Sequence, residues 1–344
     1  MKIAQLAPLW KEIPPKKYGG TELIVSYITE ELVKRGHEVT LFACGISRTK
    51  ARLVSIISKT LYELKGGFDW SDISYNVLNA RKCFEMADSF DIIHNHMSQE
   101  ALVFSPFVKT PVVSTCHSSA PPDFPHLARA MKNENYISIS DAQRRNAPYL
   151  NYVATIYHGI EVEKFEFNDR PKNYLFFMGT MSPTKGVDIA CRIAKRLNMR
   201  LILAGDIRKD SLKFFKEKVK PYVDGRKIKF LGEIDFKTKV KLYKNALAFI
   251  YPVRWNEAFG LVIPEALACG TPVIAFGNGS MPEIIDDGKT GFIVEPDNIF
   301  GLEKAVKKIN KIDRKICRQV AEQRFTVKRM VDDYEFLYRR FVKK

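Results

Sequence analysis

Two glutamates, Glu257 and Glu265, lie eight residues apart where a strand pattern gives way to a helix pattern. The helix macrodipole favours one carboxylate at a helix start, but it does not account for the setting of both. Between them, the backbone amides of Phe259, Gly260 and Leu261 can hold phosphate or hydroxyl oxygens. Carboxylates repel phosphate and accept hydrogen bonds from neutral hydroxyls. A ligand that offers both kinds of group is a nucleotide sugar.

Two further segments could meet the phosphates of such a ligand. A loop after the first strand pattern ends in Gly19-Gly20 at a helix start, where a glycine backbone approaches a ligand closely and first-turn amides favour an anion. The alternative is a plain turn with Thr21 as the helix N-cap. Lys185, in MGTMSPTKG (178–186), follows another strand pattern and could reach a phosphate; the alternative is a merely solvated lysine.

Short apolar strand patterns alternate with helix patterns in both halves of the chain. Helices are expected over 21–36 and 186–198, and strands over 2–8, 38–44, 91–96, 111–117, 136–140 and 153–159, then over 173–179, 201–205, 227–233, 247–253 and 272–276. This alternation predicts parallel sheets covered on both faces. The polar segment 161–173 divides the two series, so we expect two doubly wound α/β domains joined by a linker. Ligands bind at the carboxyl ends of such strands, which makes the interdomain cleft the expected site.

The chain has 344 residues and a formal net charge of +16, which is unevenly spread. Lys and Arg outnumber Asp and Glu by 18 to 17 over residues 1–163 and by 37 to 22 over residues 164–344. A basic half indicates an anionic partner such as a nucleic acid, an anionic membrane or a phosphorylated small molecule. A lysine-rich solvated surface is the alternative. Because the lysines are scattered and not interleaved with aromatic residues, the pattern argues against a nucleic-acid-binding protein.

Several sequence patterns are absent, and each absence narrows the function. No GxGxxG follows the first strand and no GxxxxGK[ST] occurs, which removes a dinucleotide fingerprint and a P-loop. No Asp-x-Asp occurs, so we expect no metal and no other cofactor, and the six cysteines form no CxxC pair. No apolar run approaches the roughly 18 residues of a membrane span, and no signal-peptide pattern opens the sequence. We therefore expect a cytoplasmic protein, with peripheral contact at the inner membrane face left open.

The stretch EAFGLVIPEALACGTPVIA (257–275) resembles the Glu-x7-Glu signature of retaining family-4 glycosyltransferases, which have the GT-B fold. The resemblance extends over nearly the whole chain. It includes the Gly-Gly loop, TCH (115–117), ISISDAQRR (137–145), YHGIEVEKF (157–165), GTMSPTKG (179–186), GSMPEIIDDGKTGFIV (279–294) and the C-terminal RFTVKRMVDDYEFLYRRF (324–341). It implies an acceptor-binding Rossmann-like domain over 1–163, a nucleotide-sugar-binding one over 164–325, and a helix over 326–344 that packs back on the first domain.

The resemblance also implies roles for individual residues. Glu265 would bind the donor ribose, Glu257 the donor sugar, and Lys185 the diphosphate. The amides of Phe259, Gly260 and Leu261 would line the sugar and diphosphate, with Gly19 and Gly20 approaching from the first domain. His117 would lie beside the anomeric carbon, although a histidine that ends a strand is otherwise a core or capping residue. His117, Glu257 and Lys185 are thus the candidate catalytic residues.

The sequence departs from the family pattern at one position. The family usually has Gly-Arg before the lysine loop, and its arginine also grips the diphosphate, whereas this chain has Gly179-Thr180. Arg254 is our candidate substitute; packing on Trp255 is the alternative.

The expected activity is transfer of a hexose from a nucleoside-diphosphate sugar, UDP-glucose before GDP-mannose, to an acceptor hydroxyl without a metal. The acceptor could be a sugar, a lipid-linked glycan or a small molecule, and the loops 9–19, 45–70 and 118–134 expected to recognise it show no informative pattern. A nucleotide-sugar epimerase, a glycan phosphorylase and a non-enzymatic nucleic-acid-binding protein are the alternatives.

Overall fold

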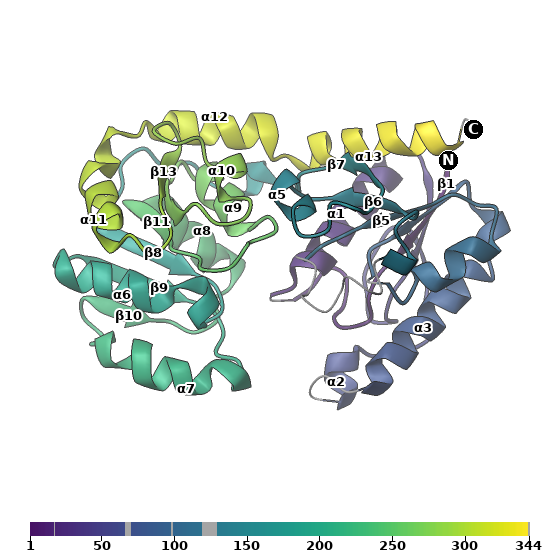
Figure 1. Cartoon of the computed structure of the whole chain (residues 1–344), viewed down its shortest axis with the longest axis horizontal. Helices are drawn as coiled ribbons and strands as arrows, with labels where there is room; N and C mark the ends of the chain where they lie inside the picture. Colours follow the sequence, from purple (N-terminus) through teal and green to yellow (C-terminus); the bar gives the residue numbers. More distant parts are fainter. Residues whose placement is uncertain (17, 66–69, 98, 119–128, 343–344) are drawn as a thin grey trace. The chain divides into compact units, whose positions relative to one another are not determined.

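The computed structural model describes residues 1–16, 18–65, 70–97, 99–118 and 129–342. The chain forms two compact units (Figure 1). Unit 1 contains Met1–Gly159 together with Val327–Lys344, and unit 2 contains Ile160–Thr326. Unit 2 thus begins at the buried Ile160, whereas the resemblance implied a boundary after residue 163.

In the described part of unit 1, seven parallel strands form one sheet in the order β3-β2-β1-β4-β5-β6-β7. The strands are β1 (Lys2–Leu6), β2 (Glu38–Phe42), β3 (Arg52–Val54), β4 (Ile92–Asn95), β5 (Val112–Thr115), β6 (Asn135–Ser138) and β7 (Tyr152–Thr155). The helices are α1 (Gly20–Lys34), α2 (Leu61–Lys65), α3 (Trp70–Phe84), α5 (Asp141–Arg144) and α13 (Val327–Val342). Central strands are buried along their length because helices cover both faces.

The alternation of side chains along β1 shows which helix covers which face. Ala4 and Leu6 pack in one apolar cluster with Cys83 and Phe84 of α3. Gln5 points to the other face and donates to the hydroxyl of Tyr338 in α13. Helix α13 packs against α1 on that face, as predicted for the C-terminal helix, and Glu335 of α13 accepts from Arg35 at 3.0 Å.

Unit 2 has a six-stranded parallel sheet among its residues, in the order β10-β9-β8-β11-β12-β13. The strands are β8 (Tyr174–Met178), β9 (Arg200–Ala204), β10 (Ile228–Phe230), β11 (Ala248–Tyr251), β12 (Val273–Phe276) and β13 (Gly291–Val294). The helices are α6 (Val187–Arg196), α7 (Leu212–Phe214), α8 (Phe236–Asn245), α9 (Val262–Ala268), α10 (Met281–Ile284), α11 (Ile299–Lys308) and α12 (Arg314–Arg324). Helices α6 and α11 pack together, and α9 packs against α8 and α12. Two doubly wound parallel sheets confirm the predicted fold class.

Strands β3 and β13 were not predicted. Both are edge strands, of only three and four residues. The polar segment 161–173, predicted as a linker, is held on unit 2: Arg318 donates to the carbonyl oxygens of Val162 and Phe165 at 3.2 and 2.6 Å. Phe165 is buried. None of the helices in the described ranges combines the length and apolar character needed to cross a membrane.

Candidate active site

The most densely bonded acidic group at the carboxyl end of the unit 2 sheet is Glu257. Its Oε2 accepts from the Tyr251 hydroxyl at 2.8 Å and the Trp255 indole Nε1 at 3.1 Å, and it forms an ion pair with Lys185. Tyr251 ends β11, and Lys185 follows the neighbouring strand β8. Carboxyl ends of parallel strands meet at one sheet edge, and Lys185 and Glu257, two of the predicted site residues, lie together there. Oε1 of Glu257 makes no hydrogen bond to any residue that the structure describes.

The Lys185 ammonium lies over two aromatic faces as well as beside Glu257. Its Nζ is 4.9 Å from the centre of the Trp255 ring and 5.5 Å from that of Tyr251. Cation–π contacts and one ion pair stabilise a lysine that is largely withdrawn from solvent. The charge of Lys185 is therefore fixed in place before any ligand arrives. A simply solvated lysine, the alternative reading of the sequence, does not describe this residue.

Two glycines allow the loops around Glu257 to approach closely. Gly186 has φ +71°, and a Cβ there would lie 2.0 Å from the carbonyl oxygen of Pro252. Gly279 has φ +59°, and its Cβ would lie 2.3 Å from the carbonyl oxygen of Glu257. A larger residue would displace the backbone of Pro252 if it replaced Gly186, and that of Glu257 if it replaced Gly279.

Glu265 lies in the first turn of α9, as predicted, and is buried. Its Oε1 accepts from Lys239 Nζ of α8 at 2.6 Å. Burial and the nearby Glu265 carboxylate together raise the pKa of Tyr243 well above its ordinary value. Phe259 is buried against the ring of Phe325. Gly260 has φ +83°, and Leu261 is the N-cap residue.

Thr180 stands where the family usually has an arginine, and Arg254 is the candidate substitute for that arginine. Thr180 is buried. Arg254 pairs with Asp188 at 3.4 Å and with Asp297 at 3.6 Å. Among the described residues, the cation over the Trp255 ring is Lys185.

The Gly-Gly segment of unit 1 begins α1 directly. Gly19 is the N-cap residue and Gly20 the first helical residue, so the alternative with Thr21 as N-cap is wrong. The carboxylate of Glu22 folds over this turn, because a Cβ on Gly19 would lie 2.9 Å from Glu22 Oε2. Burial raises the pKa of Glu22. An anion at these amides would meet a carboxylate already there, a feature that sequence reasoning missed.

His117 follows β5 in unit 1 and is half-buried in a group with three buried histidines, His94, His96 and His158. Its Nε2 lies 2.9 Å from Nδ1 of His96, and its ring stacks on that of His158 with centroids 5.3 Å apart. His94 and His96 flank the end of β4. Burial lowers the pKa of His117 to about 3. Sequence reasoning found His117 alone; the His-x-His spacing at 94–96 and the YHG at 157–159 were the available signals.

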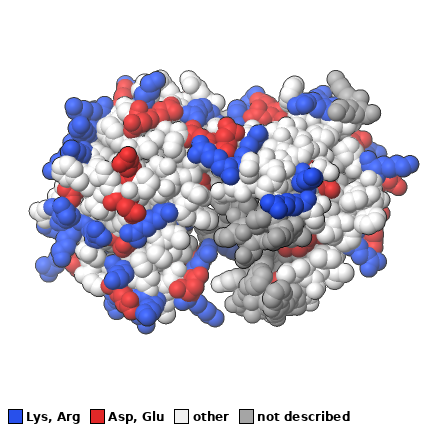
Figure 2. Space-filling model, viewed as in Figure 1, with Lys and Arg blue, Asp and Glu red and all other residues white. Residues whose placement is uncertain are grey.

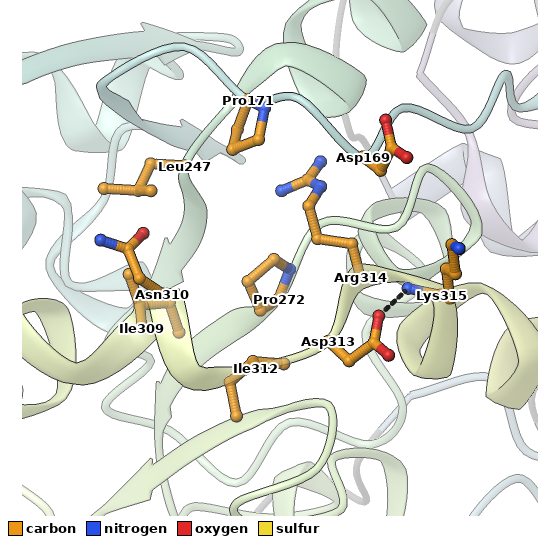
Figure 3. A pocket seen from close by; sticks show the side chains of 10 residues that line it. All are labelled: Asp169, Pro171, Leu247, Pro272, Ile309, Asn310, Ile312, Asp313, Arg314 and Lys315. Carbon is orange, nitrogen blue, oxygen red and sulfur yellow. Dashed lines mark hydrogen bonds between the residues drawn. The ribbon is translucent and has the colours of Figure 1, made fainter.

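A cavity of about 300 Å³ in unit 2 lies at the opposite, amino-terminal edge of the sheet (Figure 3). Leu247 and Pro272, which directly precede β11 and β12, line it together with Arg314. The Arg314 guanidinium donates to the carbonyl oxygens of Asn168, Ala246 and Lys244 and to the Thr271 hydroxyl, at 2.7 to 3.0 Å. With its donors used in this way, Arg314 holds loops together and is not a ligand group.

Two family descriptions match consecutive parts of the chain. Glycosyltransferase Family 4 matches residues 18–163, and Glycosyl transferases group 1 matches residues 160–324. The chain belongs to the family-4 glycosyltransferases. It is therefore an enzyme that transfers a sugar from a nucleotide sugar.

This glycosyltransferase resembles several known proteins along most of its length. An uncharacterized glycosyltransferase of Methanocaldococcus jannaschii is 25% identical, with 87% of this chain and 86% of that protein covered. Phosphatidyl-myo-inositol mannosyltransferase of Mycobacterium tuberculosis is also 25% identical, with 86% and 83% covered.

Solved structures share the fold at lower identity. Sucrose-phosphate synthase from Thermosynechococcus elongatus has a TM-score of 0.82 at 18% identity, covering 98% of each chain. HepE of Anabaena, in complex with UDP and glucose, has a TM-score of 0.74 at 21% identity, covering 98% of this chain and 99% of that one. These likenesses identify the fold as GT-B.

Charged residues of both signs lie on the visible face of unit 2 (Figure 2). On the face shown in Figure 2, Lys and Arg alternate with Asp and Glu over unit 2 and form no continuous basic strip. A nucleic-acid-binding role has no support from this distribution.

Proposed function

We propose that this glycosyltransferase retains the anomeric configuration and uses UDP-glucose first and GDP-mannose next, transferring the hexose to an acceptor hydroxyl without a metal. The observation that carries the proposal is the set of contacts made by Glu257. Its Oε2 is bound by Tyr251, Trp255 and Lys185, and its Oε1 is left for a ligand. An acceptor-only oxygen selects hydroxyl groups, as a sugar provides. The complex of HepE with UDP and glucose supports a glucose donor, and the mannosyltransferase relative supports mannose as the next candidate.

The proposed roles of the site residues follow from the charges that develop during the reaction. Departure of the nucleotide builds negative charge on the diphosphate and positive charge at the anomeric carbon. Lys185 would stabilise the first, because its ammonium is already in place and needs no reorganisation. Glu257 would hold donor hydroxyls, and the leaving phosphate would take the proton of the acceptor hydroxyl. His117 would act beside the anomeric carbon, and Gly19 and Gly20 near the diphosphate.

A thermal-shift series with UDP, GDP, UDP-glucose and GDP-mannose tests the donor. A tight ligand stabilises the folded state by mass action, so the true donor should raise the melting temperature most. We expect UDP-glucose to give the largest shift, in the presence of EDTA as in its absence. Larger shifts with GDP-mannose would overturn the preferred donor. Conversion of the nucleotide sugar with no acceptor present would indicate an epimerase instead.

Replacing Glu265 with alanine should weaken binding of UDP by about 2 to 4 kcal/mol. The proposed reason is loss of two charge-assisted hydrogen bonds to the ribose, measured by isothermal titration. Glu303→Ala is the matched control, because Glu303 is also a buried, ion-paired glutamate of unit 2 but lies on α11. Equal UDP affinity in Glu265→Ala and the wild type would refute the ribose role.

Replacing Arg254 with alanine tests the proposed substitute for the missing arginine. A charge-assisted contact to phosphate is worth roughly 1.5 to 3 kcal/mol, so donor affinity should fall by that amount, and Thr180→Arg should restore part of it. The pairs with Asp188 and Asp297 allow the opposite result, a loss of stability alone. Additive effects of the two substitutions on turnover would exclude a shared phosphate, because a shared partner produces coupling.

A further inference from the structure

A chain of buried hydrogen bonds leads from β1 to His117 within unit 1. The side-chain oxygen of Gln5 lies 2.6 Å from Nε2 of His96, and Nδ1 of His96 lies 2.9 Å from Nε2 of His117. Gln5 and His96 are almost completely buried. The far nitrogen of His117, Nδ1, is also buried and has no hydrogen-bond partner among the described residues.

The donor and acceptor in each of these hydrogen bonds follow from the orientation of the Gln5 side-chain amide, which has a partner on both its nitrogen and its oxygen. Its amide nitrogen donates to the Tyr338 hydroxyl at 3.4 Å, which turns its oxygen toward His96. A carbonyl oxygen only accepts, so Nε2 of His96 must carry the proton. Burial lowers the pKa of His96 well below its ordinary value, so the ring is neutral and its Nδ1 holds a lone pair.

The same reasoning applies to the His117 ring. Nδ1 of His96 can only accept, so Nε2 of His117 must donate to it. His117 is also neutral, because burial lowers its pKa to about 3. Its Nδ1 therefore has no proton and offers a buried lone pair. A buried acceptor without a partner costs free energy until something donates to it.

The neighbouring branch of the network is consistent with this orientation of Gln5. Because the Tyr338 hydroxyl accepts from Gln5, its own proton is available to Nδ1 of His94, at 2.5 Å. Nε2 of His94 then donates to the Thr115 hydroxyl at 2.7 Å, which in turn meets the Tyr334 hydroxyl at 3.0 Å. As far as the Thr115 hydroxyl, each donor in this branch has an acceptor. Reversing Gln5 would reverse both branches together.

We propose that Gln5 and His96 are positioning residues that hold His117 in the tautomer protonated at Nε2, so that its Nδ1 accepts a hydrogen bond from a ligand hydroxyl. The choice of a sugar as that ligand rests on the proposed function. A phosphate or carbonyl oxygen cannot donate and would leave the lone pair unsatisfied. The tautomer thus makes the His117 position selective for hydroxyl groups over anionic oxygens.

Proton-coupled nitrogen-15 NMR of histidine-labelled protein tests the tautomer without any donor. In the wild type, we expect His117 to show a protonated Nε2 and an unprotonated Nδ1. Gln5→Leu should mix or invert the two forms. Gln5→Glu, which keeps an acceptor toward His96, should preserve the wild-type pattern. The control is Tyr334→Phe, which removes a buried hydroxyl at the end of the other branch and should leave His117 unchanged. A protonated Nδ1 in the wild type would overturn the proposal.

Binding of UDP-glucose analogues, each with one hydroxyl replaced by fluorine, tests the ligand group. Fluorine cannot donate, so one analogue should bind the wild type roughly tenfold more weakly than UDP-glucose, and His117→Ala should lose that discrimination. Gln5→Leu should weaken it while leaving affinity for UDP unchanged. Equal discrimination in the wild type and His117→Ala would refute the hydroxyl contact. If UDP-glucose itself fails to bind the wild type, the proposed donor is wrong, and the NMR result still decides the tautomer.

Discussion

Replacing Glu257 with alanine is expected to lower turnover about a hundredfold or more, with little change in affinity for bare UDP. In the proposed function only the sugar meets Glu257, so the free diphosphate should bind almost as before. The structure adds a second cause of the loss in rate. Glu257 fixes the Lys185 ammonium, and without that carboxylate the lysine is held by the Trp255 and Tyr251 rings alone. Turnover and isothermal titration with UDP measure the two effects.

Glu257→Gln separates the charge from the shape. The amide oxygen can still accept from Tyr251 and Trp255, so the loop should keep its place while the ion pair with Lys185 is lost. We expect turnover to fall in both variants and melting temperature to fall more in the alanine variant. Lys185→Ala should weaken UDP binding on its own. A large loss of UDP affinity in Glu257→Gln would assign Glu257 to the diphosphate site, contrary to the proposal.

Replacing Arg314 with methionine is expected to destabilise unit 2 by about 3 to 5 kcal/mol. Arg314 is buried, and its guanidinium satisfies three backbone carbonyl oxygens, those of Asn168, Lys244 and Ala246. Burial lowers its pKa to about 10, so it remains charged at neutral pH. Methionine fills part of the space but leaves these acceptors without donors. Lysine should rescue little, because an ammonium cannot reproduce the planar fork of donors.

Fluorine-19 NMR of protein labelled with fluorotryptophan can follow this loss during urea unfolding. Trp255 is the sole tryptophan in the sequence of unit 2, whereas Trp10 and Trp70 belong to unit 1. The Trp255 signal should shift to lower urea in Arg314→Met. Arg192→Met is the control, because Arg192 is exposed on α6 and should be nearly neutral. Unchanged stability in Arg314→Met would show that the carbonyl oxygens find other donors.

The parts of the candidate site that the sequence predicted share a common origin. Lys185 and Glu257 each follow the carboxyl end of a strand, and β8 and β11 are neighbours in the sheet. Glu265 could be placed because a helix start is a local pattern. Local patterns of this kind can be recognised in a single sequence, and the resemblance to family 4 also rests on them.

The parts that the sequence did not predict depend on contacts between distant segments. Gln5 contacts His96 and Tyr338, which are 91 and 333 positions away in the sequence. No sequence period or spacing predicts contacts over such separations. Arg314 is one basic residue among several in α12, and only burial distinguishes it. The Glu22 carboxylate was visible in the sequence, but its fold over Gly19 depends on the turn geometry. Buried polar networks of this kind require coordinates.

The position of helix α13 in the sequence also affects the order in which the two units can fold during synthesis. Unit 2 is a continuous segment, Ile160–Thr326, whereas unit 1 needs residues from both ends of the chain. Tyr334 and Tyr338 are wholly buried in unit 1, and they bond to Gln5, His94 and Thr115. Domains fold as their sequence emerges from the ribosome. Unit 1 therefore stays incomplete until α13 has left the exit tunnel, and by then unit 2 has its entire sequence available.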